Sequence, residues 1–109
     1  MDCLFCKIAK GKEDADIVYE DEDMVAFKDV EPKAPTHILV APKKHIPTLK
    51  EAEEQHEELL GKLVLTAKNI AEEREADGYK LVMNVGEEGG QLIKHIHIHL
   101  LIGKPKQWP

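Results

Sequence analysis

Along most of the chain, apolar residues alternate with polar ones or form short runs, a pattern typical of β-strands. Two strands are expected on either side of a loop at 21–23, a third after two prolines, and two more toward the C-terminus. The five predicted strands cover residues 17–20, 24–27, 37–41, 79–84 and 94–102.

Between the third and fourth strands the apolar period changes to three and four residues, which predicts one long amphipathic helix. Thr48 and Glu51 have the spacing of a capping box, so we expect this helix to follow them, and Gly78 to end it. Its apolar stripe comprises Leu59, Leu60, Leu63, Val64, Ala67, Ile70 and Ala71. A short helix is expected between Cys3 and Gly11. The predicted fold class is therefore α+β, with a five-stranded, mainly antiparallel sheet.

The size and charge of the chain exclude several classes of function. A length of 109 residues fits a single domain, 1–109. A formal charge of −6 argues against a broad surface for nucleic acid or anionic membrane, but not against a small phosphate ligand. The sequence shows neither a membrane-spanning run nor a signal peptide, so we expect a cytoplasmic protein that uses no nucleic acid and no membrane.

Three histidines, His95, His97 and His99, alternate with apolar residues in the last predicted strand. Alternate strand residues share a face, so the three imidazoles are expected on one side and the apolar residues in the core. Three imidazoles together need water, a metal or a ligand. Two interpretations remain at this point, a metal site and nucleophilic attack on phosphorus. The preceding Gly89-Gly90-Gln91 and the nearby Asn84 favour phosphate, because glycine lets the backbone approach an anion closely.

The stretch from His95 to Leu101 resembles the histidine-triad motif, His-x-His-x-His followed by apolar residues. The resemblance covers nearly the whole chain and is strongest to the Hint branch of histidine-triad nucleotide-binding proteins. Further matching segments are Phe27-Lys28-Asp29, Ala34 to Val40, Pro42 to His45, Gly78-Tyr79, Asn84, Gly89-Gly90-Gln91 and Trp108-Pro109.

This resemblance implies a HIT-like fold and a homodimer whose two sheets join. It also implies binding of purine nucleoside monophosphates and hydrolysis of nucleoside phosphoramidates or related adenylates. His97 would be the nucleophile and would form a nucleotidyl-histidine intermediate that water then hydrolyses. The residues implied to bind substrate are Asp29, His37, Asn84, Gly90, Gln91, His99 and, in a tail reaching toward the partner, Trp108.

One position departs from the family pattern. The Hint branch usually has Ser after the Gly-Gln pair, whereas this chain has Leu92. Two alternatives therefore stay open. One is a dinucleoside-polyphosphate hydrolase or nucleotidyltransferase, and the other is a non-catalytic nucleotide-binding regulatory module.

Cys3 and Cys6 have the C-x-x-C spacing that suits a metal, and in a reducing compartment they are not expected to form a disulfide. A pair of surface thiols is the alternative. His45 and His95 resemble the other two ligands of the zinc site of many bacterial histidine-triad proteins, which implies a structural zinc. His56 lies among glutamates and is expected to be solvated on the charged face of the helix.

Overall fold

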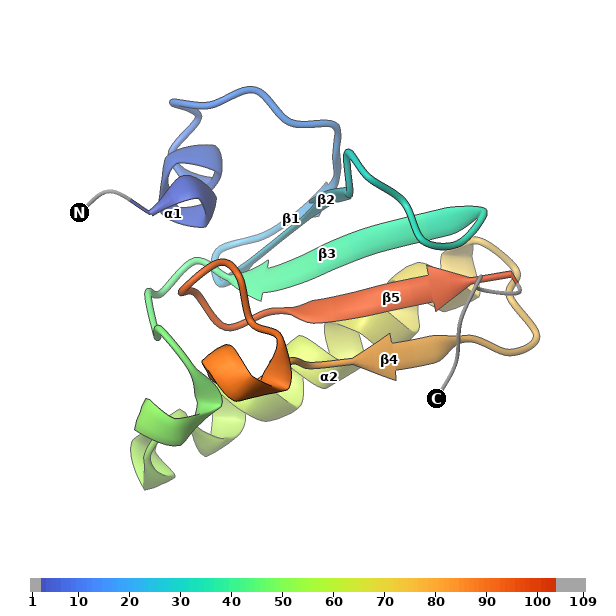
Figure 1. Ribbon diagram of the computed structural model, residues 1–109. Helices are drawn as coiled ribbons and strands as arrows, with labels where there is room; N and C mark the ends of the chain where they lie inside the picture. The colour runs from blue at the N-terminus through green and yellow to red at the C-terminus, as the bar shows by residue number, and fades with distance from the viewer. Residues whose placement is uncertain (1–2, 104–109) are drawn as a thin grey trace.

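The computed structural model describes residues 3–103 and confirms the predicted α+β class (Figure 1). The helices are α1 (Leu4–Ala9) and α2 (Glu57–Glu73), and the strands are β1 (Ile17–Glu20), β2 (Met24–Lys28), β3 (Thr36–Pro42), β4 (Lys80–Val82) and β5 (Ile98–Ile102). Three short 3₁₀ turns are η1 (Leu49–Glu51), η2 (Glu54–His56) and η3 (Glu87–Gly89). The strands form one antiparallel sheet in the order β1-β2-β3-β5-β4.

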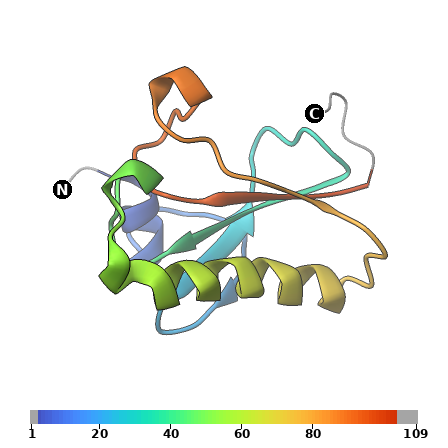
Figure 2. The ribbon, with the colours of Figure 1, turned by 90° about the horizontal axis from the view of Figure 1, so that it is seen from below.

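Helix α2 covers one face of the sheet, and Figure 2 shows it lying along that face. The core between them consists of Met24, Ala26, Ile38, Val40, Ile98 and Leu100 from the strands and Leu63, Ala67, Ile70 and Ala71 from α2. These positions follow periods of two in the strands and three or four in the helix, as expected. Val64 is the exception in the predicted stripe, because its side chain is 46% exposed.

Helix α1 packs against the opposite face of the sheet. Its Phe5 and Ile8 meet Phe27 and Leu39, which alternate with the residues that face α2. This second core is smaller, and it covers only part of the face. The sheet therefore has one face shielded by α2 and another that α1 leaves partly open, and the histidines lie beside α1.

The start of α2 differs from the prediction. Thr48 precedes η1 and not α2, and its Oγ1 is buried without a hydrogen-bond partner. The chain then makes a second turn, in which the backbone N–H of Glu53 donates to Nδ1 of His56 at 3.0 Å. Helix α2 begins at the next residue, Glu57. The expectation that His56 is solvated was therefore wrong, because His56 is buried and shapes the entry to the helix.

The end of α2 also lies earlier than predicted. The helix ends at Glu73, and Glu75 takes a left-handed conformation with φ of 57°. The N–H groups of Glu75 and Ala76 donate to the carbonyls of Glu72 and Ala71. This is the Schellman arrangement, which glycine usually completes. Here a glutamate completes it, and Gly78 plays no part.

The last strand is shorter than predicted. Strand β5 begins at Ile98, so only His99 of the three histidines lies within it. The alternation nevertheless continues upstream, since Ile96 is buried like Ile98. Figure 2 shows the η3 turn and the loop before β3 rising from the face opposite α2. Within residues 3–103, the longest helix is too short and too polar to cross a membrane.

Candidate functional site

His97 is fixed by the backbone just before β5. Its Nδ1 lies 2.7 Å from the carbonyl oxygen of His95, a distance at which Nδ1–H donates to that oxygen. The ring is buried, and the ring of Phe5 packs against it in a T-shaped arrangement with 4.9 Å between ring centroids. In the neutral imidazole the other nitrogen, Nε2, is then unprotonated. Within the described residues Nε2 has no hydrogen-bond partner, so its lone pair is available.

His99 is held in a hydrogen-bond chain that begins at a backbone amide. The N–H of Lys33 donates to Nδ1 of His37 at 3.0 Å, so the proton of the neutral His37 ring lies on Nε2. That Nε2–H lies 2.9 Å from Nδ1 of His99 and donates to it. The neutral His99 ring must therefore carry its own proton on Nε2. Through these two hydrogen bonds, the fixed backbone N–H of Lys33 determines that His99 donates from Nε2.

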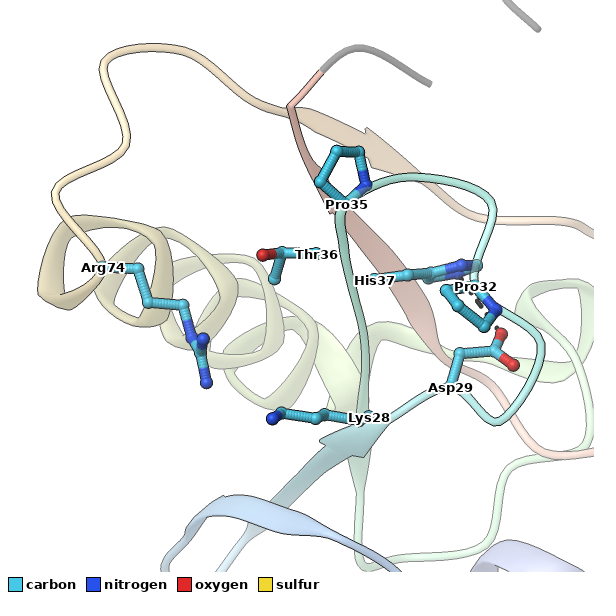
Figure 3. Close-up of a pocket in the computed structure, with 7 residues that line it drawn as sticks. All are labelled: Lys28, Asp29, Pro32, Pro35, Thr36, His37 and Arg74. Carbon is cyan, nitrogen blue, oxygen red and sulfur yellow. Dashed lines mark ion pairs between the residues drawn. The ribbon is translucent and has the colours of Figure 1, made fainter. Parts of the chain in front are cut away.

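Asp29 stands beside this chain. Its Oδ2 is 3.4 Å from Nε2 of His37, and its Oδ1 accepts the N–H of Glu31 at 2.8 Å. Figure 3 shows Asp29 and His37 turned to the same side of β3. The ligand atoms of Asp29, His37 and His99 lie close enough for a metal ion. However, a metal-binding histidine usually donates its other N–H, whereas Nδ1 of His37 accepts one. The geometry favours a hydrogen-bond chain.

Burial keeps these histidines neutral. It lowers the pKa of His37 and of His97 below the usual value for histidine. The same cause, with added repulsion from His97 and His37, lowers the pKa of His99 to about 4. The unliganded site therefore contains neutral imidazoles at physiological pH. With Nδ1 accepting from His37, the neutral His99 ring is a hydrogen-bond donor through Nε2–H.

The loop that follows β4 contains three predicted substrate-binding residues, Asn84, Gly90 and Gln91. Gly90 has a φ of 87°, which favours glycine, and it faces the side chain of Asn84. The side chain of Gln91 is already engaged, because it accepts the N–H of Gly86 and donates to the carbonyl of Pro47. Gln91 thus holds the loop in place through its side chain, and its backbone N–H also donates to the carbonyl of Gly86 at 3.0 Å.

The four predicted metal ligands converge although they come from three parts of the chain. Nδ1 of His95 lies 3.3 Å from Sγ of Cys3 and 3.6 Å from Sγ of Cys6. Nδ1 of His45 lies 3.4 Å from Sγ of Cys6 and 3.1 Å from Nδ1 of His95. All four atoms lie within 4.8 Å of one another, and the two cysteines form no disulfide.

These distances fit a tetrahedral zinc ion. Zn–N bonds of about 2.0–2.1 Å and Zn–S bonds of about 2.3 Å separate the ligand atoms of such a site by roughly 3.3–3.8 Å. Nε2 of His95 lies 2.7 Å from the carbonyl of Pro42 and donates to it, which leaves Nδ1 unprotonated for a metal. Without a cation, burial and the adjacent Cys3 raise the pKa of the Cys6 thiol. The donor set therefore suits a divalent ion that stabilises thiolates.

Two features of the site could not be found by sequence reasoning. Phe5 packs against the rings of both His95 and His97. Its position between the two cysteines is the only signal, and that signal does not specify a ring contact. The Lys33 N–H is a backbone group, so no side-chain pattern predicts its role. Trp108 lies outside the described residues.

Comparisons with known proteins agree with this geometry. Residues 2–107 match the family described as scavenger mRNA decapping enzyme C-term binding. A purine nucleoside phosphoramidase of Escherichia coli is 45% identical over 104 residues, covering 94% of this chain and 87% of that protein.

Two solved structures are also similar. A HIT family hydrolase from Legionella pneumophila has a TM-score of 0.93 and 46% identity, covering 99% of this chain and 98% of that one. A zinc-bound histidine triad family protein from Mycobacterium smegmatis has a TM-score of 0.81 and 29% identity, covering 98% and 78%. The shared sheet, the alternating histidines and these similarities together establish that the chain belongs to the histidine triad (HIT) family.

Proposed function

We propose that this protein hydrolyses purine nucleoside phosphoramidates or related adenylates through a nucleotidyl-His97 intermediate. The observation that carries the proposal is the 2.7 Å contact between Nδ1 of His97 and the carbonyl oxygen of His95. It leaves Nε2 unprotonated and fixes the ring against Phe5. An oriented, neutral imidazole is a competent nucleophile toward phosphorus. The phosphoramidase from Escherichia coli, at 45% identity, supports this choice of substrate class.

The proposed reaction has two displacements. In the first, Nε2 of His97 forms a bond to phosphorus while the P–N bond breaks, and the departing amine takes up a proton. The His97 ring then carries positive charge, which the hydrogen bond from Nδ1–H to the His95 carbonyl stabilises. In the second, water attacks phosphorus and loses a proton to solvent, the bond to Nε2 breaks, and nucleoside monophosphate leaves. The His97 ring returns to its neutral form with the proton on Nδ1.

His99 is proposed to donate Nε2–H to a phosphoryl oxygen. The chain from Lys33 through His37 makes this tautomer the stable one, so the donor is oriented before substrate arrives. Asn84 would contact the same phosphate, and Gly90, whose N–H already donates to the carbonyl of Glu87, would let the chain approach it closely. Asp29 would bind the ribose hydroxyls while it remains beside His37.

Leu92 bears on the leaving group. Its side chain is 91% exposed, and it supplies no proton where the Hint branch usually has Ser. We propose that water protonates the departing amine, because a neutral His99 would become an imidazolate if it gave up Nε2–H. A phosphoramidate whose amine is a poor leaving group would then be hydrolysed slowly. An adenylate with an acidic leaving group would be the better substrate.

A structural zinc is proposed at Cys3, Cys6, His45 and His95. The ligand spacing and the zinc-bound relative support it. When bound, zinc would hold the N-terminal segment and the segment before β5 together, and so would fix the backbone that orients His97. In this proposal His95 binds metal and also supplies the carbonyl that orients the nucleophile.

A homodimer is proposed through the β4 edge of the sheet. In the sheet formed by residues 3–103, strand β4 is at one end of the strand order, and on α2 the side chains of Val64 and Leu65 are 46% and 56% exposed. Exposed apolar residues beside an edge strand are surfaces that a second copy can cover. The partner's tail would then bring Trp108 toward the site.

One assay separates the proposed function from the two alternatives. Purified protein is tested against adenosine 5′-phosphoramidate, an acyl adenylate and a diadenosine polyphosphate, with His97→Ala as the control. We expect hydrolysis of the first two and at least about a 10³-fold loss in the control. Preferred hydrolysis of the dinucleotide would support the first alternative. Binding of nucleoside monophosphate without turnover of any substrate would support a regulatory module.

A further inference from the structure

A small pocket lies at the end of α2, beside the first residue of β3. It measures about 160 Å³ and is lined by Lys28, Asp29, Pro32, Pro35, Thr36, His37 and Arg74. In Figure 3 the side chains of Lys28, Thr36 and Arg74 lie on one side of β3, and those of Asp29 and His37 lie on the other. The first three side chains therefore belong to a group separate from the proposed catalytic site.

The strand geometry explains this division. Successive residues point to opposite faces of a sheet. Lys28 precedes Asp29 and Thr36 precedes His37, and the N–H of Asp29 donates to the carbonyl of His37 at 2.9 Å. The two neighbouring segments thus supply one pair of side chains to each face. The face that receives Lys28 and Thr36 is the one that α2 covers, and there Arg74 joins them.

Two cationic side chains, Lys28 and Arg74, and one carboxylate, Asp29, line the pocket. The chain carries a formal charge of −6, and Arg74 is its only arginine. Within residues 3–103, the guanidinium of Arg74 forms no ion pair with a carboxylate. The ammonium of Lys28 is 3.6 Å from Asp16, and both side chains are more than half exposed. The carboxylate of Asp29 lies 3.4 Å from Nε2 of His37 and accepts the N–H of Glu31.

We propose that this pocket binds a small oxyanion, with the chemistry of phosphate or sulfate. Arg74 offers a planar fork of N–H donors, Lys28 a point charge and Thr36 a hydroxyl, and these groups suit a tetrahedral anion. The volume of about 160 Å³ is smaller than the roughly 300–1,000 Å³ typical of pockets for drug-sized ligands. The pocket therefore takes an anionic group and not a nucleoside, and it does not depend on the proposed hydrolase activity.

The test follows the side chain of Arg74 directly. The full-length, ¹⁵N-labelled protein is titrated with inorganic phosphate at constant ionic strength, and the Nε–H resonance of Arg74 is followed with the amides of Lys28 and Thr36. Saturable shifts of all three are expected. Resonances of His99 report separately on phosphate in the nucleotide site. Shifts at His99 alone, or shifts at Arg74 that rise linearly without saturation, would overturn the proposal.

Matched variants decide whether the pocket itself binds the anion. Arg74→Ala should weaken phosphate binding, read from the Lys28 and Thr36 amides, by about tenfold or more. Arg74→Lys should recover only part of the affinity, because it keeps the charge without the fork. Lys68→Ala removes a helix lysine that pairs with Glu72 and should leave binding unchanged. An equal loss in Lys68→Ala and Arg74→Ala would show general charge attraction and contradict a built site.

A second titration distinguishes the source of the anion. Glycerol 3-phosphate replaces inorganic phosphate under the same conditions. Saturable shifts with both compounds support a pocket that accepts a phosphoryl group of a larger molecule, and shifts with inorganic phosphate alone support a site for the free ion. Saturable binding of neither compound refutes the proposal, and well-dispersed spectra of each variant confirm that folding is intact.

Discussion

His95 orients His97 through its backbone while its side chain faces the cysteines. The carbonyl oxygen of His95 accepts from Nδ1 of His97 at 2.7 Å, and Nδ1 of His95 lies 3.3 Å from Sγ of Cys3. One residue therefore joins the proposed zinc site to the proposed nucleophile. Displacing the backbone at His95 should therefore disturb the orientation of His97.

The first prediction concerns the position of three protons. We expect His97 to be the Nδ1–H tautomer, and His37 and His99 to be Nε2–H tautomers, because of their backbone and ring partners. Long-range ¹H–¹⁵N correlation spectra of the histidine rings measure this. A proton on Nε2 of His97 would remove its nucleophilic lone pair and contradict the proposed mechanism.

The second prediction treats His37 as a positioning residue. His37→Phe removes both hydrogen bonds of the chain and should lower kcat by roughly tenfold to a hundredfold, with a smaller effect on binding of nucleoside monophosphate. His37→Gln provides the matched control, since its amide N–H can still donate to Nδ1 of His99. We expect partial recovery of kcat in that variant. An equal loss of kcat in both variants, with spectra showing that both are folded, would argue against the hydrogen-bond chain from Lys33 through His37 to His99.

The third prediction concerns acid pH. Burial, with repulsion from His97 and His37, holds the pKa of His99 at about 4, below the ordinary 6.5. Between these values the unfolded chain binds a proton that the folded chain does not. The free energy of unfolding should therefore fall as pH decreases through this window. NMR titration of the His99 ring measures the pKa, and a midpoint near 6.5 would contradict the burial argument.

The fourth prediction concerns the metal. Purified protein should contain about one zinc per chain, and Cys3→Ser should lower the free energy of unfolding by more than about 4 kcal/mol. Phe5→Leu, a nearby core change that keeps all four ligands, should cost less and retain zinc. Metal analysis and denaturant unfolding measure both effects. Full stability of a zinc-free wild-type protein would count against a structural role.

The sheet and α2 could be predicted from sequence because their apolar periods are regular. The entry to α2 could not, because the Thr48 and Glu51 spacing predicted a cap that the structure does not use. The structure instead pairs Glu53 with His56 in the turn before α2, and His56 becomes buried there. Similarly, Glu75 adopts the left-handed conformation for which Gly78 seemed better suited. Tertiary packing decided both ends of the helix.

The candidate site was predictable in part for the same reason. Alternation along residues 95–99 indicated that the histidines act together, but it did not give their separate hydrogen-bond partners. Cys3 and His95 are 92 positions apart, and their contact followed only from the family resemblance. The proton positions depend on two backbone groups, the carbonyl of His95 and the N–H of Lys33. Backbone groups occur at every residue, so no residue pattern marks these two.

The most direct test of the account is to trap the covalent intermediate. The protein is mixed with an adenosine 5′-phosphoramidate or acyl adenylate, quenched under conditions that preserve phosphorus–nitrogen bonds to histidine, and analysed by intact mass and peptide fragmentation. We predict an adenylyl group on Nε2 of His97, which accumulates within one turnover and is absent from His97→Ala. An adduct on another residue, or normal turnover by His97→Ala, would contradict the account.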